Sequence, residues 1–166
     1  MHEFISDLIE HPKVRETLLH MHHSIPKHDH IMRVTRYSYR LARLVQADPR
    51  ICTRAAVIHD IDSRYGTLWN HGEVAARFAA EIGEDEAVCA AIRSHMYPLG
   101  PAPTSREGWV VTVADKAASL ADFADFLRGL LTGKSIQRRR VLKQTDPFYR
   151  PRRRRGALRR AFSIDT

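Results

Sequence analysis

The sequence predicts a single all-α domain followed by a basic C-terminal extension. The chain has 166 residues, of which 43% are hydrophobic and 28% are charged, so it can bury one core without disulfides or a structural metal. Apolar residues recur every three or four positions along nearly the whole body, as on the buried face of a helix. No hairpin signal links alternating strands. We therefore expect a helical domain at residues 1–128 and an extension at 129–166.

The first third of the chain is expected to contain short helices and one long helix. Residues 4–9 have the spacing of a short amphipathic helix. Pro12 suits the first turn of a second helix, where the missing N–H of proline costs nothing. Residues 30–46 carry an apolar stripe on one face and four arginines on the opposite face, which predicts a helix packed on the core.

The middle of the chain is expected to contain three further helices. Asp48 is an N-cap residue followed by proline, which predicts a helix over 49–58. A second helix is expected over 71–83, where a glycine stops it. Asp85 is expected to cap a third helix, which runs towards residue 95.

The last predicted helix is long and follows a proline-rich loop at residues 98–103. It begins near Ser105 and ends near Phe126. Residues 109–113 alone resemble a strand, but helical pattern flanks them, so we interpret them as buried helix. Beyond residue 129 the pattern thins, and the charge block at 150–155 is expected to stay unpacked.

The charge of the chain is unevenly divided. The formal net charge is +8, but residues 128–166 hold 13 Lys and Arg against two acids and therefore carry +11. Residues 1–127 hold the other 14 basic and 17 acidic side chains, which gives −3. Only the extension is therefore a candidate for binding nucleic acid or an anionic surface, through residues 138–160. The alternative is a solubilising, disordered end.

The remaining composition bears on location and redox state. No apolar run approaches the roughly 18 residues that a membrane span needs. The opening residues lack the basic region and apolar stretch of a signal peptide, so we expect a cytoplasmic protein. Cys52 and Cys89 stand alone in separate segments, and we expect both to be reduced and buried.

Six polar residues lie on helix faces that should be buried. They are His30, His59, Asp60, His71, His95 and Asp115. An unpaired carboxylate inside an apolar helix, as at Asp115, would cost several kcal/mol in desolvation. Taken singly, each residue could be a core histidine bonded to a carbonyl, or an aspartate paired with arginine. Taken together they need a common partner, and a divalent metal suits imidazole and carboxylate ligands.

In chain order the six residues form the pattern His…His-Asp…His…His…Asp, which resembles the HD superfamily of metal-dependent phosphohydrolases. Residues 30–34 match the family's His-x-x-Arg-Val opening, and residues 56–61 resemble its apolar approach to the His-Asp doublet. Residues 113–119 resemble its closing aspartate segment. The resemblance covers about residues 25–125 and is nearest to the small, single-domain HD proteins.

The resemblance implies a site with two divalent ions, most readily manganese or iron, with cobalt, nickel, zinc or magnesium as alternatives. By analogy with the two-metal branch, His30, His59, Asp60 and Asp115 hold the first ion. Asp60 then bridges to a second ion held by His71 and His95. Such ions generate hydroxide from water near neutral pH and neutralise charge on a phosphoryl oxygen. The implied reaction is hydrolysis of a phosphate ester, phosphodiester or anhydride in a small, nucleotide-like substrate, with Asp60 among the catalytic residues.

Basic residues beside the expected ligands are candidates for holding the substrate phosphate. Arg33 and Lys116 each lie close in sequence to an expected ligand. Many family members continue the doublet as His-Asp-Ile-Gly-Lys, with the lysine helping to hold phosphate. Here the run is His-Asp-Ile-Asp-Ser-Arg, so Arg64 is the candidate replacement for that lysine.

Two other functions fit the same residues. Some HD proteins with this ligand set hold a mixed-valent iron pair and use oxygen to cleave carbon–carbon or carbon–phosphorus bonds, and their turnover depends on iron and oxygen. Alternatively, the domain is a non-catalytic scaffold for a nucleic-acid-binding extension.

Overall fold

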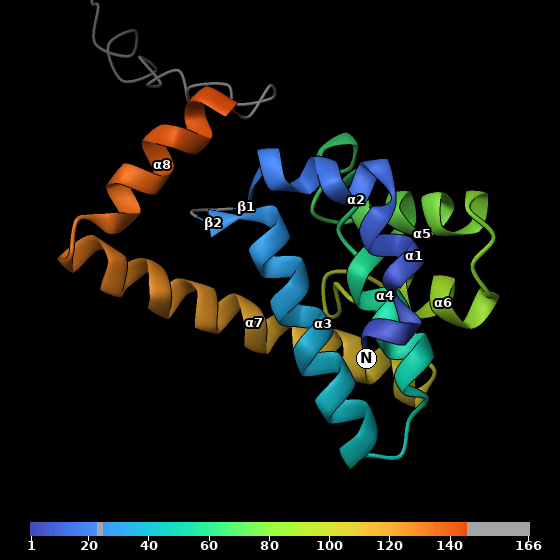
Figure 1. Ribbon diagram of the computed structural model, residues 1–166. Coiled ribbons are helices and arrows are strands. Elements are labelled where there is room, and N and C mark those ends of the chain that lie inside the picture. The colour runs from blue at the N-terminus through green and yellow to red at the C-terminus, as the bar shows by residue number, and fades with distance from the viewer. Residues whose placement is uncertain (23–24, 146–166) are drawn as a thin grey trace, which may run out of the picture.

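The structure is a computed structural model that describes residues 1–22 and 25–145 (Figure 1). It confirms the all-α prediction. The helices are α1 (Ser6–Glu10), α2 (Pro12–Glu16), α3 (Lys27–Leu44), α4 (Pro49–Ile58), α5 (His71–Glu81), α6 (Glu86–Ser94), α7 (Arg106–Leu131) and α8 (Lys134–Thr145). Short 3-10 turns lie at His2–Phe4, Thr17–Leu19 and Ser63–Tyr65.

Extended structure in the described residues is limited to one pair of very short strands. β1 (Met21–His22) pairs antiparallel with β2 (Ile25–Pro26). We did not expect this pair, because two residues are too few to show an alternating pattern. Within the described residues, no helix combines the length and apolar character that crossing a membrane requires.

The helix starts follow the capping residues in the sequence, with one correction. The Asp48 side chain accepts hydrogen bonds from the backbone N–H groups of Arg50 and Ile51, as expected of an N-cap. Asp85 occupies the N-cap position of α6, but its side chain makes no cap bond. The carboxylate lies 2.8 Å from the guanidinium of Arg50 instead, so this contact to another helix replaces the local one.

The C-terminal part of the described chain is more helical than expected. Residues 109–113 are helical within α7, as predicted. α7 does not end near Phe126 but continues to Leu131, and α8 follows Gly133, whose φ is +73°. The predicted boundary at residue 128 therefore falls inside α7. The charge block at 150–155 lies outside the described residues.

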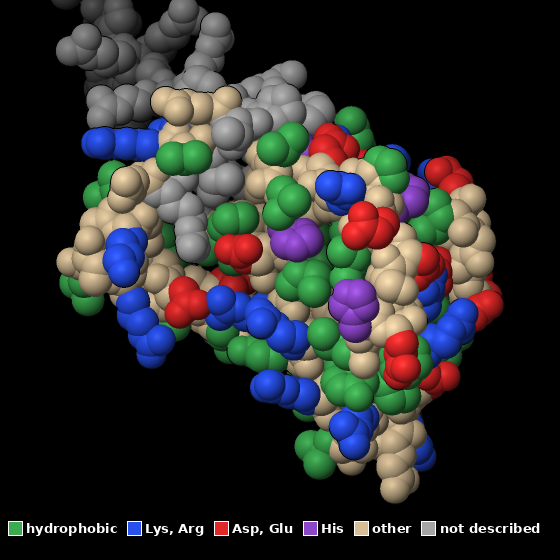
Figure 2. Space-filling view, viewed as in Figure 1, with side chains coloured by type: hydrophobic (Ala, Val, Ile, Leu, Met, Phe, Trp, Pro, Cys, Tyr) green, Lys and Arg blue, Asp and Glu red, His purple; other side chains and the backbone are tan. Residues whose placement is uncertain are grey.

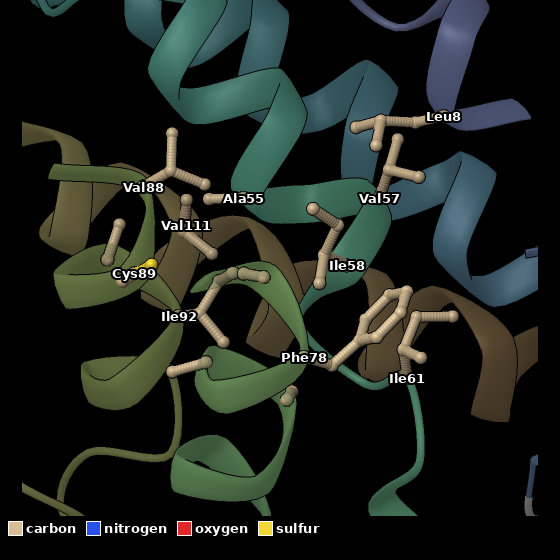
Figure 3. Close-up of a cluster of buried hydrophobic side chains, with 14 of the residues drawn as sticks. Leu8, Ala55, Val57, Ile58, Ile61, Phe78, Val88, Cys89, Ile92 and Val111 are labelled. Atoms are coloured by element: carbon tan, nitrogen blue, oxygen red, sulfur yellow. The ribbon is translucent and has the colours of Figure 1, made fainter. Parts of the chain in front are cut away.

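The core lies between α4, α5 and α6, with contributions from α1 and α7 (Figure 3). Leu8, Ile58, Phe78, Ile92 and Val111 are among the buried side chains that meet there. Full burial of such a side chain contributes about 1.5–3 kcal/mol. Cys52 and Cys89 are free and buried, as expected.

Small residues bring three helices close together beside this core. α3 packs along both α4 and α7 (Figure 1). Val34 of α3 meets Ala56 of α4 and Ala114 and Ala118 of α7 in one buried cluster. Because alanine side chains are short, the backbones approach closely there. The first turn of α3, the end of α4 and the middle of α7 therefore come within reach of one another.

Candidate metal centre

The six polar residues meet in one buried cluster. They come from, or directly follow, five of the described helices: His30 in α3, His59 and Asp60 after α4, His71 in α5, His95 after α6, and Asp115 in α7. Each is at most 8% exposed. The structure therefore brings together side chains that the sequence separates widely.

The cluster has two overlapping halves. In one, Asp115 Oδ1 lies 3.3 Å from His30 Nε2 and 3.8 Å from His59 Nε2. In the other, His71 Nε2 lies 3.6 Å from Asp60 Oδ1 and 3.1 Å from His95 Nε2. His59 belongs to both halves, because its donor atom also groups with those of Asp60 and His95 within 4.8 Å.

All four imidazoles are held by their outer nitrogen. In each ring Nδ1–H donates to an oxygen: Asp122 Oδ2 for His30 (2.7 Å), the Ala56 carbonyl for His59 (2.8 Å), the Thr67 carbonyl for His71 (3.1 Å) and the Ile92 carbonyl for His95 (2.7 Å). Because a carbonyl only accepts, the proton sits on Nδ1 and the Nε2 lone pair points inward. Metal-binding histidines are oriented in this way.

The inner nitrogens fit a divalent cation. His59 Nε2 is buried and has no hydrogen-bond partner among the described residues. The Nε2 atoms of His71 and His95 face each other at 3.1 Å, so two lone pairs would repel without a cation between or beside them. Burial lowers the pKa of His59 to about 3 and also lowers the pKa of His95. Both rings are therefore neutral near pH 7, which is the form that binds metal.

His30 is the exception, because carboxylates hold a proton on it. Burial alone would lower its pKa, but the bonds to Asp115 and Asp122 outweigh burial and raise that pKa to about 9. The pKa of Asp115 lies well below its usual range, because the His30 bond and the nearby imidazoles and Lys116 outweigh its burial. Proton and metal therefore compete for the same inner nitrogen of His30.

Glycine allows the second half of the cluster to form. Gly72 follows His71 and packs against the end of α6. A Cβ atom there would lie 3.0 Å from the Arg93 carbonyl oxygen, 3.2 Å from the Ile92 carbonyl oxygen and 3.4 Å from His95 Nδ1. The absence of a side chain therefore lets His71 and His95 approach each other.

A cavity of about 310 Å³ opens onto the cluster. Besides the six residues above, its lining includes Ser63, Gly66, Thr67, Leu68, Met96, Lys116 and Ser119. The loops after α4 and after α6 both contribute to this lining. A cavity of this size admits a small phosphorylated group.

The three candidate phosphate-binding cations lie in different places. The Lys116 ammonium lines the cavity and donates to Asp115 Oδ2 at 3.0 Å and to the His95 carbonyl at 3.1 Å. Arg33 lies behind the cluster, 3.0 Å from Asp122 Oδ1, and donates to Asp125 Oδ2 at 2.6 Å.

Arg64 points away from the cavity. It donates to Glu16 Oε1 at 3.0 Å and contacts His20 Nε2 at 2.6 Å. His20 itself is 8% exposed. The Arg64 contact and a 3.1 Å contact to Glu16 explain this burial.

Lys27, the first residue of α3, contacts the loop that follows the His-Asp doublet, and it was not identified from the sequence. Lys27 is 8% exposed, donates to Ser63 Oγ at 2.8 Å and lies 3.7 Å from Asp60 Oδ2. Its only signal is that it stands three residues before His30, on the same side of α3. The structure thus places a lysine of α3 against the loop that follows the His-Asp doublet.

Asp62 stands where many family members carry a glycine, two residues after the His-Asp doublet. Asp62 occupies that position with φ +58°, in the left-handed region that glycine tolerates best and aspartate better than most residues. Its carboxylate forms an ion pair with Lys13. The loop therefore keeps the backbone turn without glycine.

Asp122 is the second residue that the sequence did not reveal. It is 7% exposed and accepts from His30 Nδ1. It stands seven residues after Asp115, two turns along the same face of α7, and that spacing is the signal that could have found it. Asp122 orients a candidate ligand without facing the centre of the cluster.

Comparison with known proteins agrees with this geometry. The HD domain family model matches residues 28–120. The chain is also similar to glycine–tRNA ligase beta subunits: 34% identical to that of Bacillus subtilis over 57% of this chain and 16% of that protein, and 30% identical to that of Streptococcus mutans over 93% and 22%. The chain spans less than a quarter of these relatives. Because the family model covers more than half of the chain and includes all six clustered residues, the chain belongs to the HD domain family.

Proposed function

We propose that the chain is a metal-dependent phosphohydrolase that acts on a nucleotide-like phosphate ester, phosphodiester or anhydride. The observation that supports this most strongly is the orientation of the four imidazoles. Each is held by its outer nitrogen so that its inner nitrogen faces buried carboxylates. A cluster of this kind contributes little to core stability, whereas it suits a pair of divalent ions.

The proposed ligand sets follow the two halves of the cluster. His30, His59 and Asp115 would hold one ion together with Asp60. His71 and His95 would hold a second ion, and Asp60 would serve both. Manganese or iron suits this mixture of nitrogen and oxygen ligands. Bound there, the ions would supply an activated water and neutralise charge on the phosphoryl group.

The two lysines would position the phosphate. Lys116 is half-exposed at the cavity, and the buried Lys27 ammonium lies 3.7 Å from Asp60 Oδ2. Ammonium groups near the proposed metal ligands would orient phosphate oxygens by charge-assisted hydrogen bonds. Leu68 and Met96 line the mouth and offer apolar surface to the rest of the substrate.

The test is phosphate release by protein loaded with manganese or iron, measured without oxygen against nucleotides, dinucleoside polyphosphates and simple phosphodiesters. Asp60→Ala and Asp115→Ala should each lower turnover by orders of magnitude, while the exposed carboxylate variant Asp85→Ala should match the parent chain. Metal-loaded protein that releases no phosphate from any of these substrates would contradict the proposal. Turnover that requires oxygen and iron would instead support the oxygenase alternative.

A second candidate function is RNA binding, favoured by the relatives' name and by the placement of basic side chains. Figure 2 shows Lys and Arg side chains along α3. Arg36, Arg40 and Arg43 are exposed there, and Arg139 and Arg140 are exposed on α8. The remainder of the predicted 138–160 segment beyond residue 145 lies outside the described residues.

Transfer RNA binding, followed by fluorescence polarisation at several salt concentrations, tests this candidate. Arg139→Glu with Arg140→Glu should weaken binding and flatten its salt dependence. Asp115→Ala, which alters the metal cluster and its contact to Lys116 but not α8, is the control and should bind as the parent chain does. Equal binding by all variants would remove α8 from the interface.

A further inference from the structure

The long helix α7 has an apolar face that no other described residue covers. Leu120 is 72% exposed and Leu131 is 90% exposed. Val113, Phe123 and Leu127 are each about half exposed. Large apolar side chains gathered on one helix face mark an interaction surface when they are contiguous.

The spacing of this face is that of a coiled-coil seam. The row along its centre consists of Val113, Ala117, Leu120, Ala124, Leu127 and Leu131, all exposed, and Phe123 lies at its edge. The steps along this row alternate strictly between four residues and three. That period of about 3.5 residues is typical of a helix paired with another helix, whereas packing against a globular core gives a broader stripe.

The seam lies on the opposite side of α7 from the metal cluster. At about 100° per residue, Asp115 and Asp122 point roughly half a turn away from the centre of the seam. α8 returns from the end of α7 towards β2, on the side that carries the domain (Figure 1). The seam is therefore open while the cluster faces the interior.

We propose that the seam binds α7 of a second copy of this chain, antiparallel, around a two-fold axis near residue 122. In this register the outer layer pairs Val113 with Leu131 of the second copy. The next layers pair Ala117 with Leu127, and Leu120 with Ala124. In both of these layers a small side chain meets a large one, so the seam is complementary to itself, as a two-fold interface requires. The parallel register would stack Ala on Ala and leave voids.

A groove at the Val113 end of the seam can accept Leu131 of the second copy. Leu41, Val45, Trp109, Val110 and Val113 line a groove of about 320 Å³ together with Arg106. The antiparallel register places Leu131 of the second copy beside Val113, at this groove. The contact thus extends from helix pairing onto α3, along a seam of about 27 Å.

The mass of the full chain in solution tests the pairing, by sedimentation or light scattering over a range of concentrations. The parent chain should show twice its 19.1 kDa. Leu120→Glu and Leu127→Glu each place a charge in the seam and should halve that mass. Leu18→Glu alters a leucine away from the seam whose exposure (52%) lies between those of Leu127 (45%) and Leu120 (72%), and this variant should remain dimeric.

Helical content and metal content should be unchanged in these variants, which separates this proposal from the metal-dependent function. A parent chain of 19.1 kDa at all concentrations would overturn the proposal and assign the seam to another protein. A dimer that survives Leu120→Glu would overturn it as well.

Engineered cysteines test the register. Leu120→Cys mixed with Ala124→Cys should form a disulfide between the two variants, because the antiparallel register places these positions opposite each other. Neither variant alone should cross-link efficiently, and the parent chain, whose own cysteines are buried, is the background control. Cross-linking of each variant with itself in preference to the mixture would refute the antiparallel arrangement.

Discussion

Asp122 holds the outer nitrogen of His30, and Asp122→Asn isolates the contribution of that contact. The carboxylate is buried, accepts from His30 Nδ1 at 2.7 Å and lies 3.0 Å from Arg33 Nε. Asparagine keeps the shape of the side chain but removes its charge. The substitution leaves every proposed metal ligand in place.

The expected loss is one to two orders of magnitude in metal affinity. Removing such an outer partner of a ligand imidazole typically costs 10- to 100-fold, or about 1.4–2.7 kcal/mol. In the metal-free protein the Asp122 bond is also one cause of the raised pKa of His30, about 9. That pKa should therefore fall towards its ordinary value of about 6.5.

The sign of the linked stability follows from the same shift. A histidine whose pKa is raised by folding contributes stability that is fully present below its unfolded pKa and is lost as pH rises through the folded pKa. For His30 this window runs from about 6.5 to about 9. In Asp122→Asn the loss of stability across that window should shrink.

Calorimetric titration of metal-free protein with manganese measures the affinity, and the ring proton signals of His30 report its pKa. Asp125→Asn is the matched control, because Asp125 also binds Arg33, at 2.6 Å, but is more exposed and shares no described contact with His30. An affinity for Asp122→Asn within twofold of the parent chain would refute the reasoning. So would an equal loss in both variants.

Three further predictions concern the same site. Lys27→Met should lower kcat/KM about 10- to 100-fold, because one charge-assisted bond to phosphate is lost. Steady-state kinetics measures this loss, with the metal content of the variant as the control, and an unchanged kcat/KM would exclude the role of Lys27. Gly72→Ala should destabilise the fold by about 1–3 kcal/mol and weaken metal binding, because the added Cβ would push α5 away from α6. In the control Gly100→Ala, the nearest contact of the added Cβ would be 3.4 Å, so this variant should unfold in urea as the parent chain does. Equal urea midpoints for the two variants would argue against crowding at Gly72. Metal-free protein should lose stability as pH falls below about 6.5, because burial lowers the pKa values of His59 and His95 and the unfolded state takes up their protons first. His59, whose pKa is lowered to about 3, should contribute roughly 1 kcal/mol per pH unit. Urea midpoints that stay constant between pH 7 and 4 would contradict the lowered pKa values.

Local features of the sequence are sufficient to predict α1 to α7, but not α8, because the apolar pattern thins beyond residue 129. The cap at Asp48 depends on hydrogen bonds to the next two or three residues, and the apolar period depends only on helix geometry. The strand-like residues 109–113 were correctly predicted as helix because the flanking period continued through them. The end of α7 was placed too early because the apolar pattern thins around Gly129, where Leu130 and Leu131 still continue the helix.

The six clustered residues could also be identified from the sequence, because charged and imidazole side chains on apolar faces require a partner. The identity of each partner could not. His30 and Asp122 are 92 residues apart, and Lys27 and Ser63 are 36 apart. Arg64 is the basic residue nearest in sequence to the position of the family's phosphate-binding lysine, but it binds Glu16 instead. Periodicity and capping act over one or two helical turns, whereas the partner of a buried charge depends on which distant helices pack together, and only the tertiary structure decides that.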